Sequence, residues 1–487
     1  MKASTIFETD SDVEIRAIMF DSRKKVEDSI FFAMKGKIND GHKFIEKAIE
    51  NGAVCIVYSD EIDKKHDDVL YIRSDDVTAS YVSFCKTFYG DPLSKMNVVG
   101  ITGTNGKTTI AWILRSIIAH FEKCGYVGTM GYYYGEEVKD SKLWLTTPKP
   151  DELFRIGKEM LEYGCKDLIL EASSEGLQTR RLEQVEFSTA VFNNLSGDHF
   201  DVHGDMESYF KAKCLLFSML KEDGKAIINI DDAYGRRLMN ICERKKITYG
   251  IENDADYKAE NIELYNDHSV FDLVYEGKRY HITTNALALF NIYNLLAVTA
   301  VLNENGFAID SILPYLEDVE MTPGRSQMIR EGQDFNVVVD FAFTPNSFEK
   351  VFDFAESITD KGSRIIAVFG AAGDRDHKRR PGTASIADKR ADEVILSYDD
   401  PSGEDMMEIL LEMATYFKRI KPEIILDRQE AINKAVDMAK KGDTILLLGK
   451  GSDHFFLCKE GRVPYISDEQ AARNAIMKKL AKIDEKA

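Results

Sequence analysis

Proline, paired cysteines and long apolar runs are scarce in this sequence, and each scarcity excludes a class of protein. Ten prolines in 487 residues, with no low-complexity tract, exclude long disordered regions. The seven cysteines are dispersed and form no C-x-x-C pair, so we expect free thiols in a reducing compartment rather than a disulfide framework. The first residues carry no apolar signal core, and no apolar run reaches the roughly 18 residues that a membrane span needs. We therefore expect a soluble, cytoplasmic protein with no membrane partner.

Positive charge is also in short supply. Lys and Arg number 63 against 82 Asp and Glu, which gives a formal net charge of −19. This balance disfavours a nucleic-acid partner, although a few basic side chains in a cleft suffice to bind a small anionic ligand. The length predicts about three domains, and a hydrophobic content of 44% is ample for several cores.

The most informative stretch is a glycine-rich loop between a strand and a helix. An apolar run over 96–101 predicts a buried strand, and the run from Ile110 onward predicts a helix. Between them lie Gly103, Thr104, Asn105, Gly106, Lys107, Thr108 and Thr109. In this layout backbone N–H groups and the helix N-terminus bind phosphates, Lys107 reaches the terminal phosphates and the Thr108 hydroxyl can coordinate Mg²⁺. The loop is a variant, because Ile101 stands where the usual pattern has its first glycine. The alternative is a chance Gly-Lys-Thr in a loop.

Turn clusters divide the chain into three expected units. Residues 90–94 mark the first boundary and residues 322–325 the second, which gives domains at 1–94, 95–321 and 322–487. Apolar runs at 29–34 and 53–58, with a helical stretch at 42–50 between them, predict a small α/β domain in the first unit.

The second unit places polar side chains after buried strands. A strand over 165–170 ends in Glu171, a position from which a carboxylate can hold Mg²⁺ beside a nucleotide. A strand over 190–192 leads to Asp198 and His199, which could serve a metal or a substrate. Residues 251–283 alternate polar and apolar and predict an antiparallel excursion. The apolar helix over 290–302 carries Asn291 and Asn294 on one face, so a ligand or backbone partner is implied for them.

The third unit alternates strands with helical segments. We expect strands at 335–340, 364–370, 393–396, 423–426 and 444–448. This alternation predicts a second doubly wound α/β domain with a largely parallel sheet. Several strands end in polar turns, at Asp340, 373–376, 399–401 and 449–451, where open α/β sheets have their ligand crevice.

These stretches, in this order, resemble the Mur ligase family of ATP-dependent, amide-forming enzymes of peptidoglycan precursor synthesis. The matching stretches cover nearly the whole chain and are 21–23, 41–42, 103–109, 145–148, 171–174, 194–204, 212–213, 290–294, 323–325, 373–376 and 449–451. The resemblance implies an N-terminal UDP-sugar-binding domain, a central ATP-binding domain and a C-terminal, Rossmann-like domain that binds an amino acid. It is strongest to the enzymes that add the third residue to UDP-N-acetylmuramoyl-L-alanyl-D-glutamate.

The resemblance implies roles for individual residues. Lys107 and Thr108 would hold the ATP phosphates and Mg²⁺, with Glu171 and His199 as further metal ligands. Lys213 matches a lysine that the family carbamylates. Without this modification it would be a cation beside Mg²⁺, which is electrostatically unfavourable. The expected catalytic residues are thus Lys107, Lys213, Glu171 and His199. The remaining expected contacts are the loop residues 103–109, Asn291, Asn294, Arg325 and Asp340 for ATP, and Ser22, Thr146, Thr147, Ser173 and Arg181 for the UDP-sugar-peptide.

The implied reaction has two steps. The substrate carboxylate attacks the γ-phosphorus of ATP to give an acyl phosphate, and the amine of an amino acid then displaces phosphate. Water would destroy the intermediate, so we expect the third domain to close over the central one. Separately, we expect the protein to be a monomer.

The amino acid is the least defined partner. Relatives that add meso-diaminopimelate resemble one another in an Asp-Asn-Pro-Arg motif whose Arg pairs with the distal carboxylate. Here the stretch is Asp399-Asp400-Pro401-Ser402, followed by two further acids, with Asp453 as an expected neighbouring contact. Acids suit a distal ammonium, so we expect L-lysine or a similar diamino acid. The alternative is that these acids form a solvated turn.

Three departures from the family pattern and three rival functions remain. Family members often carry His at Phe343, Asp at Asn346 and His at Glu175.

The rivals are a meso-diaminopimelate ligase, a folylpolyglutamate synthetase and a nucleotide-binding protein that has lost ligation. The N-terminal Asp-Ser-Arg unit disfavours the second, and the retained loop and metal-ligand residues disfavour the third.

Overall fold

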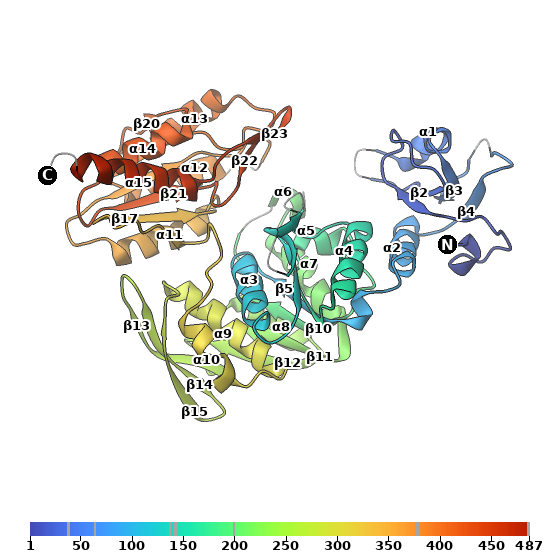
Figure 1. The fold of residues 1–487 in the computed structure, drawn as a ribbon, viewed down its shortest axis with the longest axis horizontal. Coiled ribbons are helices and arrows are strands. Elements are labelled where there is room, and N and C mark those ends of the chain that lie inside the picture. Colours follow the sequence, from blue (N-terminus) through green and yellow to red (C-terminus); the bar gives the residue numbers. More distant parts are fainter. Residues whose placement is uncertain are drawn as a thin grey trace.

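The computed structural model describes residues 1–36, 39–62, 65–135, 138–140, 145–197, 200–375, 377 and 379–484. Within these residues the chain forms three α/β domains, with the central domain between the other two (Figure 1). The predicted fold class is confirmed. The exact boundaries at 94/95 and 321/322 stay a prediction. Asp198, His199 and Asp376 lie outside the described residues.

The N-terminal domain is built on a parallel sheet in the order β1-β2-β3-β4. Its elements are η1 (Ala3–Thr5), β1 (Ala17–Met19), β2 (Ser29–Phe32), η2 (Gly41–Phe44), α1 (Ile45–Glu50), β3 (Ala53–Tyr58), β4 (Leu70–Arg73), α2 (Val77–Phe88) and η3 (Leu93–Lys95). Helix α2 leads to the central domain (Figure 1), where the Tyr81 hydroxyl donates to Asp151 Oδ1 at 2.6 Å.

The central domain contains, in its described residues, an 11-stranded sheet in the order β15-β14-β13-β12-β11-β10-β5-β9-β6-β7-β8. Its strands are β5 (Asn97–Thr102), β6 (Cys124–Gly128), β7 (Gly131–Tyr134), β8 (Val138–Asp140), β9 (Asp167–Glu171), β10 (Phe187–Phe192), β11 (Leu220–Asn229), β12 (Lys245–Gly250), β13 (Tyr257–Leu264), β14 (Ser269–Tyr275) and β15 (Lys278–Thr284). Its helices are α3 (Lys107–Ile118), α4 (Pro150–Tyr163), α5 (Ser174–Gln178), α6 (Phe200–His203), α7 (Met206–Ser218), α8 (Ala233–Ile241), α9 (Leu289–Glu304) and α10 (Ile309–Glu317).

The middle strands of this sheet are parallel and almost wholly buried, which explains why β5 and β9 are continuous apolar runs without alternation. The predicted antiparallel excursion is present as β13–β15, but β13 pairs in parallel with β12 and so extends the central sheet. Because β10, β5 and β9 are neighbours, the loops after them meet at one edge of the sheet.

The C-terminal domain has a six-stranded sheet in the order β16-β17-β21-β18-β19-β20, parallel except for β16, among its described residues. Its strands are β16 (Gln327–Met328), β17 (Asn336–Asp340), β18 (Ile365–Phe369), β19 (Glu393–Leu396), β20 (Glu423–Ile424), β21 (Thr444–Leu448) and the hairpin β22 (Phe455–Cys458) and β23 (Gly461–Pro464). Its helices are α11 (Pro345–Ile358), α12 (Arg379–Arg390), α13 (Met406–Ala414), α14 (Arg428–Met438) and α15 (Asp468–Asp484).

Helix α11 forms part of the contact between the last two domains. Leu287 and Ala288, just before α9, are buried in the same apolar cluster as Phe348 and Val351 of α11. This contact holds the N-terminal end of α11 against the central domain. In the described part of the chain, no helix is both long and apolar enough to span a bilayer.

Candidate active site

The phosphate loop joins β5 to α3 in a conformation that requires glycine at one position. Gly106 has a φ of 86° and stands directly before α3. A Cβ at this position would lie 2.3 Å from Asn193 Nδ2 and 2.6 Å from Asn294 Oδ1. The loop therefore closes onto two asparagines, and the free N–H groups at the start of α3 favour an anion in front of it.

Glu171, at the end of β9, is fully buried beside the loop. Its Oε2 accepts hydrogen bonds from the hydroxyls of Thr108 (2.9 Å) and Thr129 (3.1 Å). Its Oε1 accepts from the Tyr126 hydroxyl (2.6 Å) and the Thr129 amide (3.0 Å), and burial beside Glu171 holds the pKa of Tyr126 far above its usual value. The hydroxyls and carboxylate that converge here are hard oxygen donors, the kind that Mg²⁺ prefers.

Lys107 and Lys213 meet at one carbonyl of the loop. Lys107 Nζ donates to Gly103 O at 2.9 Å, and Lys213 Nζ donates to the same oxygen at 2.8 Å. Lys213 is almost fully buried, with its ammonium 4.4 Å from the centre of the Tyr209 ring. The structure thus brings together the two predicted lysines and Glu171, the described members of the expected catalytic set.

Asparagines behind the loop satisfy one another. Asn291 Nδ2 donates to Leu287 O at 2.8 Å, and Asn294 Nδ2 donates to Asn291 Oδ1 at 3.1 Å. Asn193 Nδ2 donates to Asn294 Oδ1 (3.2 Å) and to Asn105 O (3.0 Å). The partners expected for Asn291 and Asn294 are therefore a backbone carbonyl and other amides, which fix the wall of an adjoining cavity.

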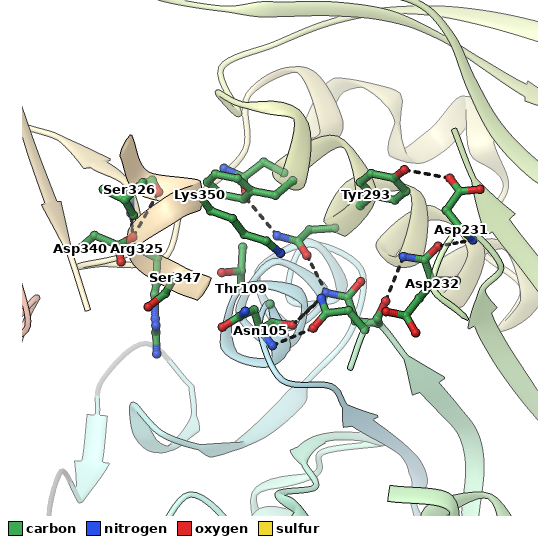
Figure 2. A pocket seen from close by; sticks show the side chains of 18 of the residues that line it. Asn105, Thr109, Asp231, Asp232, Tyr293, Arg325, Ser326, Asp340, Ser347 and Lys350 are labelled. Atoms are coloured by element: carbon green, nitrogen blue, oxygen red, sulfur yellow. Dashed lines mark hydrogen bonds between the residues drawn. The ribbon is translucent and has the colours of Figure 1, made fainter. Parts of the chain in front are cut away.

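This first cavity has a volume of about 280 Å³ and lies between the loop, α9 and the C-terminal domain. Figure 2 labels, among its lining residues, Asn105, Thr109, Asp231, Asp232, Tyr293, Arg325, Ser326, Asp340, Ser347 and Lys350. Its mixed aromatic and amide lining beside a phosphate loop suits a nucleoside attached to phosphates.

Arg325 and Asp340, the two predicted nucleotide contacts from the C-terminal domain, both line this cavity. Asp340 is buried, which raises the pKa of its carboxyl group, and it accepts hydrogen bonds from the amides of Ser326 (2.7 Å) and Ala342 (2.6 Å). Arg325 stacks 4.8 Å from the centre of the Phe341 ring, and its buried Nε has no hydrogen-bond partner among the described residues. Asp340 therefore fixes the turn, while Arg325 keeps donors available for a ligand.

A second cavity of about 320 Å³ opens on the other side of the loop. It is lined by Lys107, Thr108 and Lys213 and by three of the predicted substrate contacts, Thr146, Ser173 and Arg181. Thr147 lies behind this lining, fully buried, where its hydroxyl donates to Glu171 O at 2.7 Å. Arg325 lines both cavities, so the two meet at the phosphate loop.

Ser22 stands apart from this site. It is buried in the N-terminal domain, where its carbonyl accepts a hydrogen bond from Asn51 Nδ2 at 2.6 Å. It is not among the described residues that line either cavity. The structure therefore leaves its expected role untested.

The acids expected to bind the amino acid form a separate cluster in the C-terminal domain. Lys450 is fully buried, and its ammonium donates to Asp400 (2.7 Å) and Asp453 (3.2 Å). Burial opposes its charge, but the two carboxylates outweigh burial and raise the pKa of Lys450. Burial and the neighbouring Asp400 raise the pKa of Asp399 to about 6.

The acids that follow Ser402 also have partners within the protein. Glu404 accepts two hydrogen bonds from Arg380 (2.8 and 2.9 Å), and Asp405 caps α13 by accepting from the Glu408 amide. Counting acids along the sequence thus overestimated the negative charge available to a ligand, because Lys450 and Arg380 offset part of it from within the domain.

The three departures from the family pattern have distinct surroundings. Phe343 is half-exposed, with the Arg379 guanidinium 5.2 Å from its ring centre. Glu175 accepts from Arg181 Nη2 at 2.7 Å, which holds that arginine at the second cavity. Asn346 accepts a hydrogen bond from Asn105 Nδ2 at 2.9 Å and so contacts the phosphate loop itself.

Sequence reasoning missed Thr129, Asn193 and Lys350 as members of the site. Thr129 follows the buried strand β6 directly, and Asn193 follows β10. A polar residue directly after a buried strand was an available signal for both, since β10 neighbours the loop strand β5 and β6 lies one strand beyond β9 on its other side. Lys350 lies in an amphipathic helix, where a single lysine looks like an ordinary surface residue.

Comparison with known proteins agrees with this architecture. The family models for the Mur ligase family catalytic domain, the Mur ligase middle domain and the Mur ligase glutamate ligase domain match residues 14–84, 101–302 and 324–451. UDP-N-acetylmuramoyl-L-alanyl-D-glutamate–2,6-diaminopimelate ligase 1 of Clostridium acetobutylicum is 37% identical over 97% of this chain and 96% of its own. UDP-N-acetylmuramoyl-L-alanyl-D-glutamate–2,6-diaminopimelate ligase of Fusobacterium nucleatum is 35% identical over 96% of this chain and 96% of its own.

Solved structures show the same fold. A structure of a UDP-N-acetylmuramoyl-L-alanyl-D-glutamate–2,6-diaminopimelate ligase superposes with a TM-score of 0.68 at 27% identity, over 98% of this chain and 99% of the other. MurF ligase from Thermotoga maritima in complex with ADP reaches a TM-score of 0.64 at 18% identity, over 97% and 99% of the two chains, and so shares the fold. The site geometry agrees with these matches, and the full-length relatives show that the chain belongs to the Mur ligase family of ATP-dependent, amide-forming ligases.

Proposed function

We propose that this ligase adds one diamino acid to UDP-N-acetylmuramoyl-L-alanyl-D-glutamate, and that it is a UDP-N-acetylmuramoyl-tripeptide synthetase. The observation that carries the proposal is the meeting of two cavities at the phosphate loop, one suited to a nucleoside and one lined by Arg181 and hydroxyl side chains. Full-length relatives whose names state this acceptor support it. Consumption of ATP supports the expected cytoplasmic location.

The residues of the second cavity fit the expected chemistry. Arg181 is held by Glu175 and faces the space in front of the loop, where it binds the anionic acceptor. The acceptor carboxylate attacks the γ-phosphorus, ADP leaves and an acyl phosphate forms. Lys107 and Arg325 offset the repulsion between the two anions as they approach. The amine then attacks the acyl carbon, loses a proton and expels inorganic phosphate.

Thr108 and Glu171 would hold Mg²⁺, and their oxygen donors fit it. When bound, the ion supplies positive charge to the β- and γ-phosphates. Lys213 would reach the same region as a carbamate, formed when its neutral amine attacks CO₂ and releases a proton. Its burial beside Gly103 O places the nitrogen next to the loop. His199, which we also expect as a ligand, lies outside the described residues.

For the amino acid, we favour meso-diaminopimelate over the L-lysine expected from the sequence. Relatives at 33–37% identity over 95% or more of this chain carry 2,6-diaminopimelate in their names. The acids that favoured a distal ammonium are engaged by Lys450, Arg380 and the backbone of α13. L-lysine stays a second candidate because Ser402 stands where an arginine would pair with a distal carboxylate.

One experiment tests both the ligase reaction and the choice of amino acid. Phosphate release is measured with ATP, Mg²⁺ and UDP-N-acetylmuramoyl-L-alanyl-D-glutamate against meso-diaminopimelate, L-lysine and L-ornithine. We expect release only when the acceptor and an amino acid are both present, with the highest kcat/KM for meso-diaminopimelate. A preference for L-lysine would contradict the choice of amino acid, and release without the acceptor would contradict the ligase reaction.

A further inference from the structure

Lys350 is a cation in the first cavity that the expected site residues do not include. It lies in α11, four residues after Asn346 and therefore on the same face of the helix, which is turned to the central domain. Figure 2 shows its side chain extending into the cavity towards Thr109, in the first turn of α3. Within the described residues, the Lys350 ammonium makes no hydrogen bond or ion pair.

The acids around Lys350 do not neutralise it. Asp232 accepts from the amides of Leu195 (3.0 Å) and Tyr234 (2.8 Å), and Asp353 lies one turn further along α11. The Asp231 carboxylate accepts hydrogen bonds from backbone amides of the turn at 251–253 and from the Tyr293 hydroxyl (2.8 Å). Burial accordingly lowers the pKa of Lys350, with Asp232 and Asp353 opposing only in part. A half-buried ammonium without a partner is unfavourable unless a ligand completes its surroundings.

The lining of the two cavities indicates which part of a ligand meets this ammonium. Lys107 and Thr108, which bind the terminal phosphates, line the second cavity and are not among the described residues that line the first. Gly106 and Thr109 line both. A nucleotide that enters with its base among the residues of α9 would therefore have its innermost phosphate in the first cavity, between the start of α3 and Lys350.

We propose that Lys350 binds the α-phosphate of the nucleotide and thereby ties the C-terminal domain to the occupied phosphate loop. The inference rests on the proposed function, since it requires ATP in this cavity. An anion between an ammonium and a helix N-terminus is favoured from both sides. The contact would hold α11 against the central domain whenever a nucleotide is bound.

The test compares affinities for AMP, ADP and adenosine, measured by competition with a fluorescent ADP, in the wild type and in Lys350→Met, Lys350→Gln and Lys350→Arg. We expect Lys350→Met and Lys350→Gln to bind AMP and ADP about tenfold more weakly, the loss of one charge-assisted hydrogen bond. Adenosine affinity should stay unchanged in both. Lys350→Arg should retain AMP and ADP affinity within about threefold, because it keeps the charge.

Lys361→Met is the matched control, because Lys361 is an exposed lysine just beyond α11. It should leave all three affinities unchanged, and without nucleotide no variant should unfold at a lower temperature than the wild type, because Lys350→Met and Lys350→Gln remove an unfavourably buried charge. Equal AMP affinity in wild type and Lys350→Met would overturn the inference. An equal loss for adenosine and AMP would also overturn it, because the contact would then be to the nucleoside. Failure of the proposed function would look different: the wild type itself would bind no ADP.

Discussion

The side-chain amide of Asn105 in the phosphate loop donates a hydrogen bond to Asn346 Oδ1 at 2.9 Å, across 241 residues and between two domains. The same oxygen accepts from the Ser196 hydroxyl at 3.3 Å. Asn346 stands at the start of α11, so the helix that carries Lys350 is fastened directly to the loop expected to hold ATP. We therefore expect occupancy of the loop to influence the position of the C-terminal domain.

The first prediction concerns this link. Asn346→Ala removes the acceptor and should lower kcat/KM for ATP about fivefold, the effect of one hydrogen bond of about 1 kcal/mol. Asn346→Asp keeps an acceptor for Asn105, so it should retain activity within about twofold. Steady-state kinetics with varied ATP measure both, and equal losses in the two variants would show that the acceptor is not what matters.

The second prediction concerns the charges around the terminal phosphates. Lys107→Ala and Glu171→Ala should each lower acceptor-dependent phosphate release about 100-fold or more, because the first removes a cation that stabilises the transition state and the second removes a carboxylate expected to hold Mg²⁺. A stopped assay of released phosphate measures the loss. Full activity in either variant would show that the residue does not act in the ATP site.

The third prediction concerns Lys213. Lys213→Ala should lose activity, and millimolar short carboxylates should restore part of it by replacing the carbamate as an anionic ligand. Lys211→Ala, an exposed lysine on the same helix, is the control and should behave as the wild type. If Lys213→Ala is active without added carboxylate, the carbamate proposal is wrong.

The fourth prediction concerns the choice of amino acid. Ser402 has a left-handed backbone with φ of 52°, and its amide donates to Leu457 O at 2.9 Å, so the backbone here is fixed whatever the side chain. Ser402→Arg adds a guanidinium that can pair with a distal carboxylate. It should raise the ratio of kcat/KM for meso-diaminopimelate to that for L-lysine about tenfold. An unchanged ratio would show that this turn does not select the amino acid.

The fifth prediction concerns pH and stability. The folded state raises the pKa of Asp399 from 3.8 to about 6, so between these values the folded chain holds a proton that the unfolded chain has released. The contribution of Asp399 to stability therefore falls as pH rises through this window and is unfavourable above it. Asp399→Asn should raise the melting temperature at pH 7, by about 2–4 °C for each kcal/mol of penalty removed, and should give no gain near pH 4. Melting curves at both pH values measure this, and an equal offset at both would contradict it.

Features set by local sequence could be predicted, and features set by contact between distant segments could not. The phosphate loop, Glu171 and the strands around them follow from apolar periodicity and glycine placement, and the strand ends differ by at most three residues, the largest difference being at the start of β10. The bond between Asn105 and Asn346 and the position of Lys350 depend on how two domains meet, which no local pattern encodes.

The acidic turn shows the same limit. The sequence showed acids at 399–405, and this predicted a negative pocket. The cations that offset part of this charge come from Lys450, about 50 residues later, and from Arg380 in α12. Net charge along a segment therefore says little about charge within a folded site.

The most direct test of the central claim follows an oxygen atom. UDP-N-acetylmuramoyl-L-alanyl-D-glutamate labelled with ¹⁸O in its reacting carboxylate is turned over with ATP and the preferred amino acid, and the released phosphate is analysed by mass spectrometry. If the carboxylate is phosphorylated at the loop and then captured by the amine, each phosphate carries one ¹⁸O. Unlabelled phosphate released together with the amide product would contradict the account.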